Sequence, residues 1–438
     1  MRWVAGTEWG VGLLGLGTVG SGVWTILDRR RDAIIAEAGA AIKIRRILVR
    51  DINKDRGMPQ ASGLLTERFG DLLEDDSIQI IVDAMGGEEP ALSYMLMALK
   101  KGRHVVTANK EVMAKHGKLI EQTAAEHGCF VFTEACVGGG IPILHPLQEC
   151  FSANEVQSVT GIINGTTNYI LSHMAAGGKD YSEVLKEAQQ KGYAEADPTG
   201  DVDGYDAVYK TVILAREAFG VRLSWEQLQR EGIRPITALD IQVAERWGRV
   251  IKLLGIAQRS ENQIQAGVMP VMLPKDHRLA AVQGVNNGIL VQGDAVGEVL
   301  FAGPGAGSLP TGSAMVSDMV RIAKKITAGE RPKPVREVPI SLADFSPADY
   351  YLRWAPCGQN PGEVLQTVLA PLTATADPLS FSSGTSHEQR ACYTVIRNLS
   401  VTEKTELIDS LQGFSLPVTD ILLIPMEIPS LKTLKGGD

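Results

Sequence analysis

A glycine fingerprint near the start of the chain lies between a short apolar run and a helical pattern. The stretch "GLLGLGTVGSGVWTIL" has the form Gly15-x-Gly17-x-x-Gly20. In dinucleotide-binding folds the first glycine allows a tight turn, the second admits a pyrophosphate, and the third lets the helix pack closely. The helix N-terminus stabilises the phosphate charge. The context favours a cofactor site at these glycines with Thr18 and Val19; the alternative is an ordinary glycine turn.

The N-terminal part of the chain alternates short apolar runs with helical patterns. The runs are "GVGLLGLG", "IKIRRILVR", "IQIIVDAM", "HVVTAN" and "CFVFTEA". This alternation is typical of βαβ units on a parallel sheet. Longer helices and short strands follow, and the Pro- and charge-rich "ERPKPVREVPIS" predicts a linker. The tail has the order strand, helix, strands, helix, strand, which is typical of a ferredoxin-like module.

We therefore predict an α/β protein of three parts. At roughly 150 residues per domain, 438 residues suit two or three. The N-terminal part is a Rossmann-type parallel sheet, the central part is α+β, and the C-terminal part is ferredoxin-like. The predicted ranges are 1–142 with a completing helix near 309–330, 143–308, a linker at 331–345, and 346–438.

Composition and charge exclude several classes of protein. The net charge of -8 argues against nucleic-acid binding, which needs a dense basic face. No window reaches the roughly 18 continuous apolar residues that span a bilayer, and glycines interrupt the N-terminus where a signal peptide would be apolar. We expect a cytoplasmic protein with no membrane partner. Five scattered cysteines, with no C-x-x-C pair, indicate neither disulfides nor a zinc site.

The end of the second predicted strand bears on cofactor choice. An NAD site would place an acid there to accept from the ribose 2′-hydroxyl. In "RILVRDINKDRG", Arg50 holds that position, Asp51 follows it, and Lys54 lies beyond. Arg50 and Lys54 suit a 2′-phosphate and favour NADP, while Asp51 keeps NAD open. A solvated turn is the alternative.

The stretch "KGYAEADPTGDVDGYDAVYK" (191–210) combines five carboxylates with a terminal lysine. An EF-hand register fails, because position 1 would be Thr199 and position 12 would be Lys210, where a bidentate Glu is needed. A helix is expected to start near Asp203, which can cap it. Asp206 and Lys210 are then i and i+4 on one face. A solvated turn and an active-site wall both stay open.

Five motifs together resemble homoserine dehydrogenase. They are the glycine fingerprint, "VTANK" (106–110), "NGTTNYIL" (164–171), the acidic stretch, and "GPGAGSLPTGSAMVSD" (303–318). The resemblance covers residues 10–330 or so. It implies NAD(P)-dependent interconversion of L-homoserine and L-aspartate 4-semialdehyde, on the route to threonine, methionine and isoleucine. It also implies a small-molecule substrate and a homodimer or homotetramer, with dimer contacts in the central domain.

Reduction of an aldehyde leaves an alkoxide that needs a proton. A lysine ammonium held by a carboxylate suits this task, so Lys210 with Asp206 is a credible acid and oxyanion stabiliser. In the reverse direction the lysine must first lose its proton, so an alkaline optimum is expected for alcohol oxidation. The resemblance agrees, and it adds Lys110 as a second candidate catalytic lysine near the nicotinamide and substrate. Without the resemblance, Lys110 is as easily structural.

The resemblance also implies residues that contact substrate and cofactor. Glu195 or Asp201 would hold the amino group of homoserine by a charge-assisted bond. The other predicted contacts are Thr166, Gly192 and Tyr193 for substrate, and Lys110, Asn164 and Gly307 for cofactor. Asn164 and Thr166 can equally form an Asn-Gly turn and a helix cap.

"EACVGGGIP" resembles the family's monovalent-cation loop. The resemblance implies that Glu134 and the carbonyls of Val137, Gly139 and Ile141 bind sodium or potassium, since an oxygen-only set suits a hard cation. Cys136 in the same stretch suggests a rival, a thiolate nucleophile as in semialdehyde-oxidising enzymes. That reading requires an activating base or cation.

The tail resembles an ACT domain, which in many homoserine dehydrogenases is associated with inhibition by threonine. The relevant stretches are "YYLRW" and "NPGEVLQTVLAPL", with Asn360 where an acid is more usual. A threonine effector and a purely dimerising role both stay open. So do two other functions: a dehydrogenase of another small amino-acid alcohol or semialdehyde, and a non-catalytic sensor. The presence of Glu195, Asp206 and Lys210 counts against the sensor.

Overall fold

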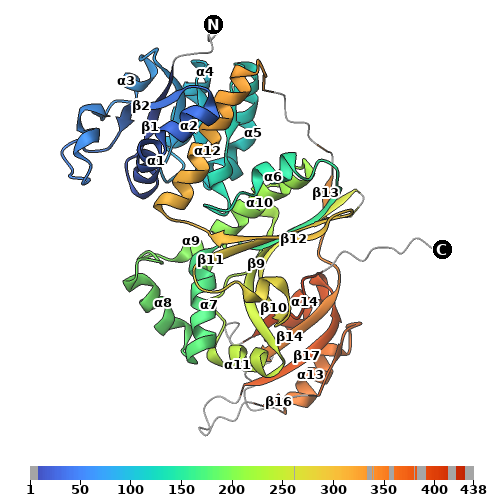
Figure 1. Cartoon of the computed structure of the whole chain (residues 1–438). Helices are drawn as coiled ribbons and strands as arrows, with labels where there is room; N and C mark the ends of the chain where they lie inside the picture. Colours follow the sequence, from blue (N-terminus) through green and yellow to red (C-terminus); the bar gives the residue numbers. More distant parts are fainter. Residues whose placement is uncertain are drawn as a thin grey trace. The chain divides into compact units, whose positions relative to one another are not determined.

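The computed structural model describes residues 8–260, 262–332, 338, 340–354, 360–378, 380–381, 391–412 and 421–429. The chain divides into two compact units: unit 1 is 1–154, 212–226 and 301–338, and unit 2 is 155–211, 227–300 and 339–438 (Figure 1). Part of the predicted linker at 331–345 and part of the tail lie outside the described residues, so the predicted domain boundaries stay predictions. Within the ranges above, no helix is long and apolar enough to cross a membrane.

Unit 1 is built on a six-stranded parallel sheet with the strand order β3-β2-β1-β4-β5-β6. This is the order of a dinucleotide-binding fold, so the predicted Rossmann-type sheet is confirmed. The elements are β1 (Glu8–Leu14), α1 (Thr18–Arg29), α2 (Arg31–Ala38), β2 (Ala41–Leu48), β3 (Leu65–Thr66), α3 (Gly70–Leu73), β4 (Ile78–Asp83), α4 (Ala91–Lys100), β5 (His104–Thr107), α5 (Lys110–Glu126), β6 (Val131–Phe132), α6 (Leu144–Glu149) and α12 (Ser308–Thr327).

Helix α12 returns to this sheet from far along the chain and lies beside α1, orange against blue in Figure 1. Side chains of α1, α2 and α12 share one apolar core with alternate residues of β1 and β4. A Cβ on Gly22 would overlap the backbone of Ser308, so the glycine permits the close helix contact. The helix predicted near 309–330 is thus present, and its glycine-rich start is packed against the helix of the fingerprint.

The central sheet of unit 2 has seven strands in the order β12-β11-β7-β9-β10-β13, with β8 paired to β10. Helices α7 and α11 pack on β9. This arrangement confirms the α+β central region. Its elements are β7 (Val156–Ile162), α7 (Gly165–Gly177), α8 (Tyr181–Gln190), α9 (Thr199–Val202), α10 (Tyr205–Phe219), β8 (Gln229–Arg230), α11 (Ala238–Arg246), β9 (Arg249–Ser260), β10 (Gln263–Pro274), β11 (Asn286–Gly293), β12 (Gly297–Pro304) and β13 (Ser341–Leu342).

The tail of unit 2 forms an antiparallel sheet in the order β15-β17-β14-β18, with β16 also paired to β17. Two helices pack on its apolar face, as the predicted ferredoxin-like module requires. Val401 and Ile428 pack against the core of the central sheet. The tail elements are β14 (Ala348–Trp354), α13 (Pro361–Leu369), β15 (Thr375–Ala376), β16 (Ser380–Phe381), β17 (Cys392–Leu399), α14 (Val401–Gln412) and β18 (Leu422–Pro425).

Candidate active site

The glycine fingerprint forms an open cradle between β1 and α1. Gly15 has a φ of +94°, which other residues rarely adopt. A Cβ on Gly20 would overlap the Gly15 carbonyl oxygen, whereas a Cβ on Gly17 would meet no atom within 4 Å. Helix α1 begins at Thr18, so its unpaired N–H groups face this space. The donors and the empty space fit a pyrophosphate.

A cavity of about 470 Å³ continues from the fingerprint along the ends of β1, β2 and β4. Gly15, Gly17, Arg50 and Lys54 all line it, so the structure brings these predicted residues together. Arg56 also lines the cavity and was missed by the sequence analysis. Its guanidinium donates to the Lys54 and Asp51 carbonyls, both at 2.7 Å, and orders the turn.

The end of β4 carries a buried acid that the sequence analysis also missed. Asp83 accepts from Thr107 Oγ1 at 2.7 Å and from the Met85 N–H at 3.0 Å. Met85 lines the cofactor cavity, so Asp83 fixes the turn that forms its wall. Burial raises the pKa of Asp83 to about 6. The available signal was an acid directly after the apolar run "IQIIV".

Lys110 is the first residue of α5, and Asn109 caps this helix by accepting from the Val112 N–H at 3.2 Å. Near this turn the Cys136 thiol donates to the Thr107 carbonyl. Burial raises the pKa of Cys136 well above its usual range, with neighbouring carboxylates adding to the rise. A buried thiol of this kind is inert, so the rival thiolate reading does not fit.

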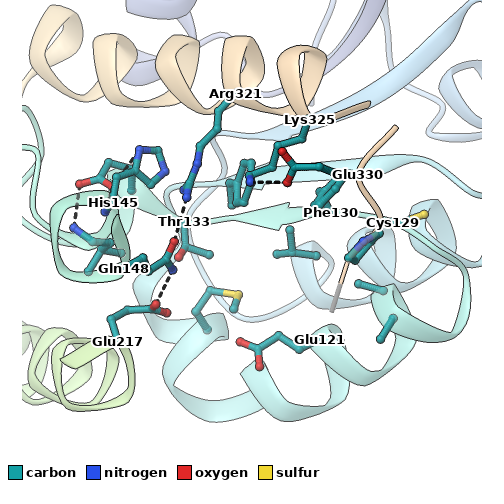
Figure 2. A pocket seen from close by; sticks show the side chains of 18 of the residues that line it. Glu121, Cys129, Phe130, Thr133, His145, Gln148, Glu217, Arg321, Lys325 and Glu330 are labelled. Atoms are coloured by element: carbon teal, nitrogen blue, oxygen red, sulfur yellow. Dashed lines mark hydrogen bonds and ion pairs between the residues drawn. The ribbon is translucent and has the colours of Figure 1, made fainter. Parts of the chain in front are cut away.

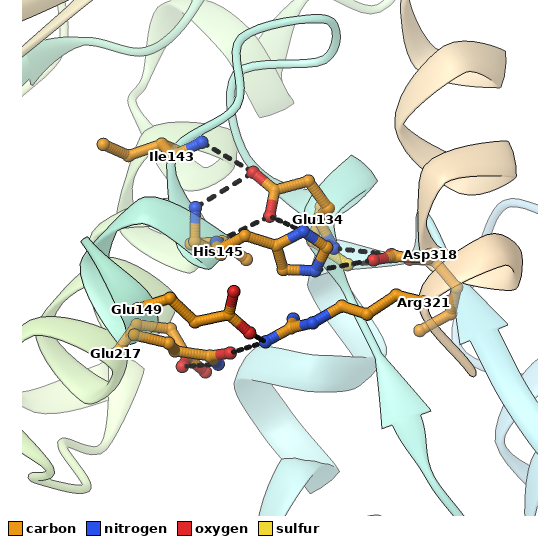
Figure 3. A network of polar contacts seen from close by, with 11 residues as sticks. Glu134, Ile143, His145, Glu149, Glu217, Asp318 and Arg321 are labelled. Carbon is orange, nitrogen blue, oxygen red and sulfur yellow. Dashed lines mark hydrogen bonds and ion pairs between the residues drawn. The ribbon is translucent and has the colours of Figure 1, made fainter. Parts of the chain in front are cut away.

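The Glu134 carboxylate has a different partner set from the one expected of a cation ligand. It accepts from the N–H groups of Ile143 (2.6 Å), Leu144 (2.9 Å) and His145 (2.8 Å), as Figure 3 shows. The His145 ring in turn lies 2.8 Å from buried Asp318. The carboxylate thus holds the start of α6, and its predicted cation role stays a prediction. Among the described residues, no cluster of His, Cys, Asp and Glu could hold a metal ion.

The loop predicted to bind the cation packs against the turn before α12. A Cβ on Gly139 would overlap Gly305, and the Gly140 N–H donates to Pro304 O at 3.2 Å. Gly307 has a φ of +122° and forms the N-cap of α12. The predicted position Gly139 therefore lies against the turn that leads to the predicted cofactor residue Gly307.

A second cavity of unit 1, of about 320 Å³, is lined in part by Glu134 and His145 (Figure 2). Several of its charged side chains pair with one another: Lys325 with Glu330 at 2.7 Å, and Arg216 with both Glu121 and Glu217. Apart from Glu134, none of its lining residues is a predicted site residue. This cavity is therefore a different feature from the predicted active site.

In unit 2, two of the three predicted catalytic side chains, those of Lys210 and Asp206, meet. Lys210 Nζ lies 2.6 Å from Asp206 Oδ2 and donates to the Ile163 carbonyl at 2.9 Å. Both side chains are 11% exposed. An exposed i,i+4 pair contributes only about 0.3–0.5 kcal/mol, but here the charges are held in one geometry and largely shielded from water.

Asn164 joins this pair to a third charged group. Its Nδ2 donates to Asp206 Oδ2 at 2.9 Å and to Asp201 Oδ1 at 2.7 Å. Its Oδ1 accepts from the Thr167 N–H at 2.9 Å and caps α7. Burial raises the pKa of Asp201, and the charge of Asp206 adds to the rise. One amide thus holds two carboxylates that would otherwise repel each other.

Two of the remaining predicted substrate residues, Thr166 and Tyr193, contact each other. Thr166 Oγ1 donates to the Tyr193 carbonyl at 2.7 Å. Gly192 has a φ of +74° and turns the chain after α8. The Tyr193 side chain is 44% exposed, and Glu195 is exposed as well.

The helix expected to start near Asp203 is present as α10, which begins at Tyr205 after Gly204 with a φ of +85°. Asp203 also ends the short helix α9 that precedes it. The Asp203 carboxylate accepts from Arg234. Asp201 is therefore in α9, and Asp206 is in the first turn of α10.

Two family models match the chain: "Homoserine dehydrogenase, NAD binding domain" over residues 15–134 and "Homoserine dehydrogenase" over 142–320. The homoserine dehydrogenase of Bacillus subtilis is 44% identical over 319 residues, which are 73% of this chain and 74% of that protein. The homoserine dehydrogenase of Synechocystis is 48% identical over 326 residues, again 73% and 74%.

Solved structures give the same result. A homoserine dehydrogenase from Thiobacillus denitrificans has a TM-score of 0.89 at 38% identity, and the match covers 98% of this chain and 100% of that one. A hyperthermophilic archaeal homoserine dehydrogenase in complex with NADPH has a TM-score of 0.63 at 26% identity, covering 75% and 100%.

Proposed function

The chain belongs to the homoserine dehydrogenase family, and from this membership we propose that the cluster around Lys210 is its catalytic centre. The enzyme is an NAD(P)-dependent oxidoreductase of aspartate-family amino-acid biosynthesis. It interconverts L-homoserine and L-aspartate 4-semialdehyde, and the bound nicotinamide supplies or accepts the hydride. The 2.6 Å contact between Lys210 and Asp206 carries the proposal.

Lys210 manages the proton of the reaction. An ammonium has three N–H groups, and in the described part of the chain two of them have partners, Asp206 and the Ile163 carbonyl. The third is left to donate to the substrate oxygen when the aldehyde is reduced. In the oxidative direction the neutral amine takes the hydroxyl proton of homoserine, so alkaline pH favours that direction.

Asp201 and Glu195 recognise the ammonium group of homoserine. Asp201 is held in place by Asn164, so an incoming cation meets a carboxylate of fixed orientation. Exposed Glu195 offers a second carboxylate at the rim of the proposed substrate site. Gly192 and Tyr193 support this rim, since Thr166 bonds to the carbonyl of Tyr193.

NADP is the favoured cofactor. Arg50 and Lys54 line the cavity at the end of β2, where a 2′-phosphate would lie, and Arg56 adds a third cationic group. Gly15, Gly17 and Gly20, with Thr18 and Val19, hold the pyrophosphate at the start of α1. Lys110, Asn164 and Gly307 are further proposed cofactor contacts.

Three features beyond the reaction are part of the proposal. Sodium or potassium binds Glu134 and the carbonyls of Val137, Gly139 and Ile141; the Glu134 carboxylate also accepts from three backbone N–H groups. The enzyme is a cytoplasmic homodimer or homotetramer. Threonine acts at the tail module, whose ferredoxin-like sheet is the support for this assignment.

Substitution of the lysine tests the proposal. Lys210→Ala should lower kcat by about 10² or more, because proton transfer is lost, while NADP affinity is retained. Steady-state kinetics with homoserine and NADP, together with NADP titration, measure both. Lys186→Ala, an exposed lysine of α8, is the control. An unchanged kcat in Lys210→Ala would remove this residue from the mechanism.

A further inference from the structure

Residues 229–237 of unit 2, here called the bridging segment, contact both the central sheet and the acidic loop at 199–206. The segment begins as β8, which pairs in parallel with β10 at Gly267 and Val268. The Glu231 N–H continues this pairing and donates to Val268 O at 2.8 Å. The first half of the bridging segment is therefore fixed to the sheet.

The next two residues hold the backbone of the acidic loop. The Ile233 N–H donates to Val202 O at 2.8 Å, and the Ile233 side chain is fully buried. A Cβ on Gly232 would lie 2.7 Å from Asp203 Cα, closer than real Cβ atoms approach. Only a glycine at this position allows the two backbones to come so close.

Two arginines of the bridging segment hold the same loop by its side chains and turn. Arg230 donates to the Asp203 carbonyl and stacks 3.7 Å from the ring centroid of Tyr205. Arg234 donates to the Asp203 carboxylate and, at 3.1 Å, to Thr199 Oγ1. These contacts lie at both ends of α9 and at the start of α10. Asp201 and Asp206 are the charged residues between and beside the contacts.

The tail module also contacts the bridging segment, through residues of α14 and β14. Lys404 of α14 donates to Glu231 Oε1 at 2.6 Å and lies 5.2 Å from the Tyr350 ring centroid. Arg353 of β14 donates to the Pro235 carbonyl at 2.8 Å.

The Lys404 side chain is 9% exposed, so its ion pair with Glu231 is largely shielded from water. Arg353 and Tyr351 both donate to Asp240, at 2.8 and 2.7 Å, and Asp240 is fully buried in α11. Removal of one member of such a buried pair leaves the other charge without compensation.

We propose that Arg230 and Arg234 are positioning residues for the carboxylates of Asp201 and Asp206. The tail module supports the two arginines through Lys404 and Glu231. The tail then serves the reaction itself, whether or not an effector binds there. The inference rests on the proposed roles of Asp201 and Asp206. A chain of fixed contacts runs from α14 through Glu231 to Asp203, so displacement at one end changes the loop at the other.

Arg234→Met tests the first step. This arginine is 44% exposed, so the variant should fold. We expect the KM for homoserine to rise about tenfold while the KM for NADP stays within about twofold, since only the substrate loop moves. Arg278→Met is the control, because Arg278 is also an exposed arginine in an ion pair, with Glu298. Arg234→Lys should recover part of the loss.

A merely structural role predicts another pattern. It would lower the midpoint of thermal unfolding and the active fraction, and hence kcat, without separating the two KM values. That pattern, or an unchanged homoserine KM, would overturn the inference. The kinetics of Lys210→Ala are independent of this outcome, so failure of the positioning role leaves the proposed catalytic role intact.

A double-mutant cycle tests the tail. The pair Glu231→Gln with Lys404→Met removes both charges without leaving one buried, and should raise the homoserine KM about threefold. Combined with Arg234→Met, the effect should be smaller than the product of the separate effects, because both changes act through one segment. The proposed role of the tail would be contradicted by a combined rise in homoserine KM equal to the product of the separate rises. It would also be contradicted if the tail pair left the homoserine KM unchanged.

Discussion

The cofactor cradle of unit 1 and the charged cluster of unit 2 are constructed in opposite ways. In the cradle, one contiguous stretch from Gly15 to Gly20 creates space by lacking side chains. In the cluster, Asn164 bonds to residues 37 and 42 positions away, and Lys210 bonds to a carbonyl 47 positions away. Added atoms should therefore damage the cradle, and lost or misplaced polar atoms should damage the cluster.

Gly20→Val should have the largest effect. Its Cβ would overlap the Gly15 carbonyl oxygen, so α1 must move away from β1. We expect a loss of more than about 4 kcal/mol in the free energy of unfolding, measured by chemical denaturation. Gly17→Ala sharpens the comparison, because its Cβ meets open space: stability should change by about 1 kcal/mol or less while NADP binding weakens. Equal stability losses in the two variants would contradict this account of the cradle.

Asn164→Ser should come next. Serine keeps the cap of α7 but removes the amide that bonds to Asp201 and Asp206. We expect kcat/KM for homoserine to fall up to about a hundredfold, since both carboxylates lose their fixed orientation. Asn360→Ser, at the N-cap of α13, is the matched control for loss of an asparagine cap. If both variants retain activity, Asn164 is only a cap.

Arg50→Ser should have a smaller and cofactor-specific effect. Loss of one charge-assisted contact to a 2′-phosphate should weaken NADP binding about tenfold and leave NAD binding unchanged. Isothermal titration with each cofactor measures the difference. The same loss with NAD and NADP would mean that Arg50 does not contact the 2′-phosphate.

Asp83→Asn should be visible in the pH dependence of stability. The folded-state pKa of about 6 lies above the unfolded value of about 3.9, so the folded protein retains the proton more strongly. The associated stabilisation is full below pH ~4 and is lost as pH rises through ~6, at most about 2–3 kcal/mol. The unfolding midpoint of the parent should fall more from pH 4 to pH 7 than that of the variant. Parallel curves would show that Asp83 does not titrate in this range.

The sequence predicted what local patterns control. Alternating apolar runs and helices predicted the parallel sheet, and the fingerprint predicted the turn at Gly15. The i,i+4 spacing predicted the contact between Asp206 and Lys210, which the structure shows at 2.6 Å. Each of these features depends on backbone geometry over a few residues.

Local patterns could not predict which hydrogen-bond partners the charged side chains have. The Glu134 carboxylate accepts from three N–H groups of residues 143–145, which no local pattern indicates. The Asp203 carboxylate accepts from Arg234, which lies 31 positions away. Both outcomes depend on which segments pack together, and one sequence carries no periodic signal for that.

Chemical rescue of Lys210→Ala tests the central claim most directly. Homoserine oxidation by this variant would be followed at alkaline pH with increasing concentrations of a small primary amine such as ethylamine. If Lys210 transfers the proton, the rate should rise with the concentration of the neutral amine, and Lys186→Ala should show no such dependence. A Lys210→Ala rate that stays flat with added amine, in protein that still binds NADP and unfolds at the parent midpoint, would contradict the claim.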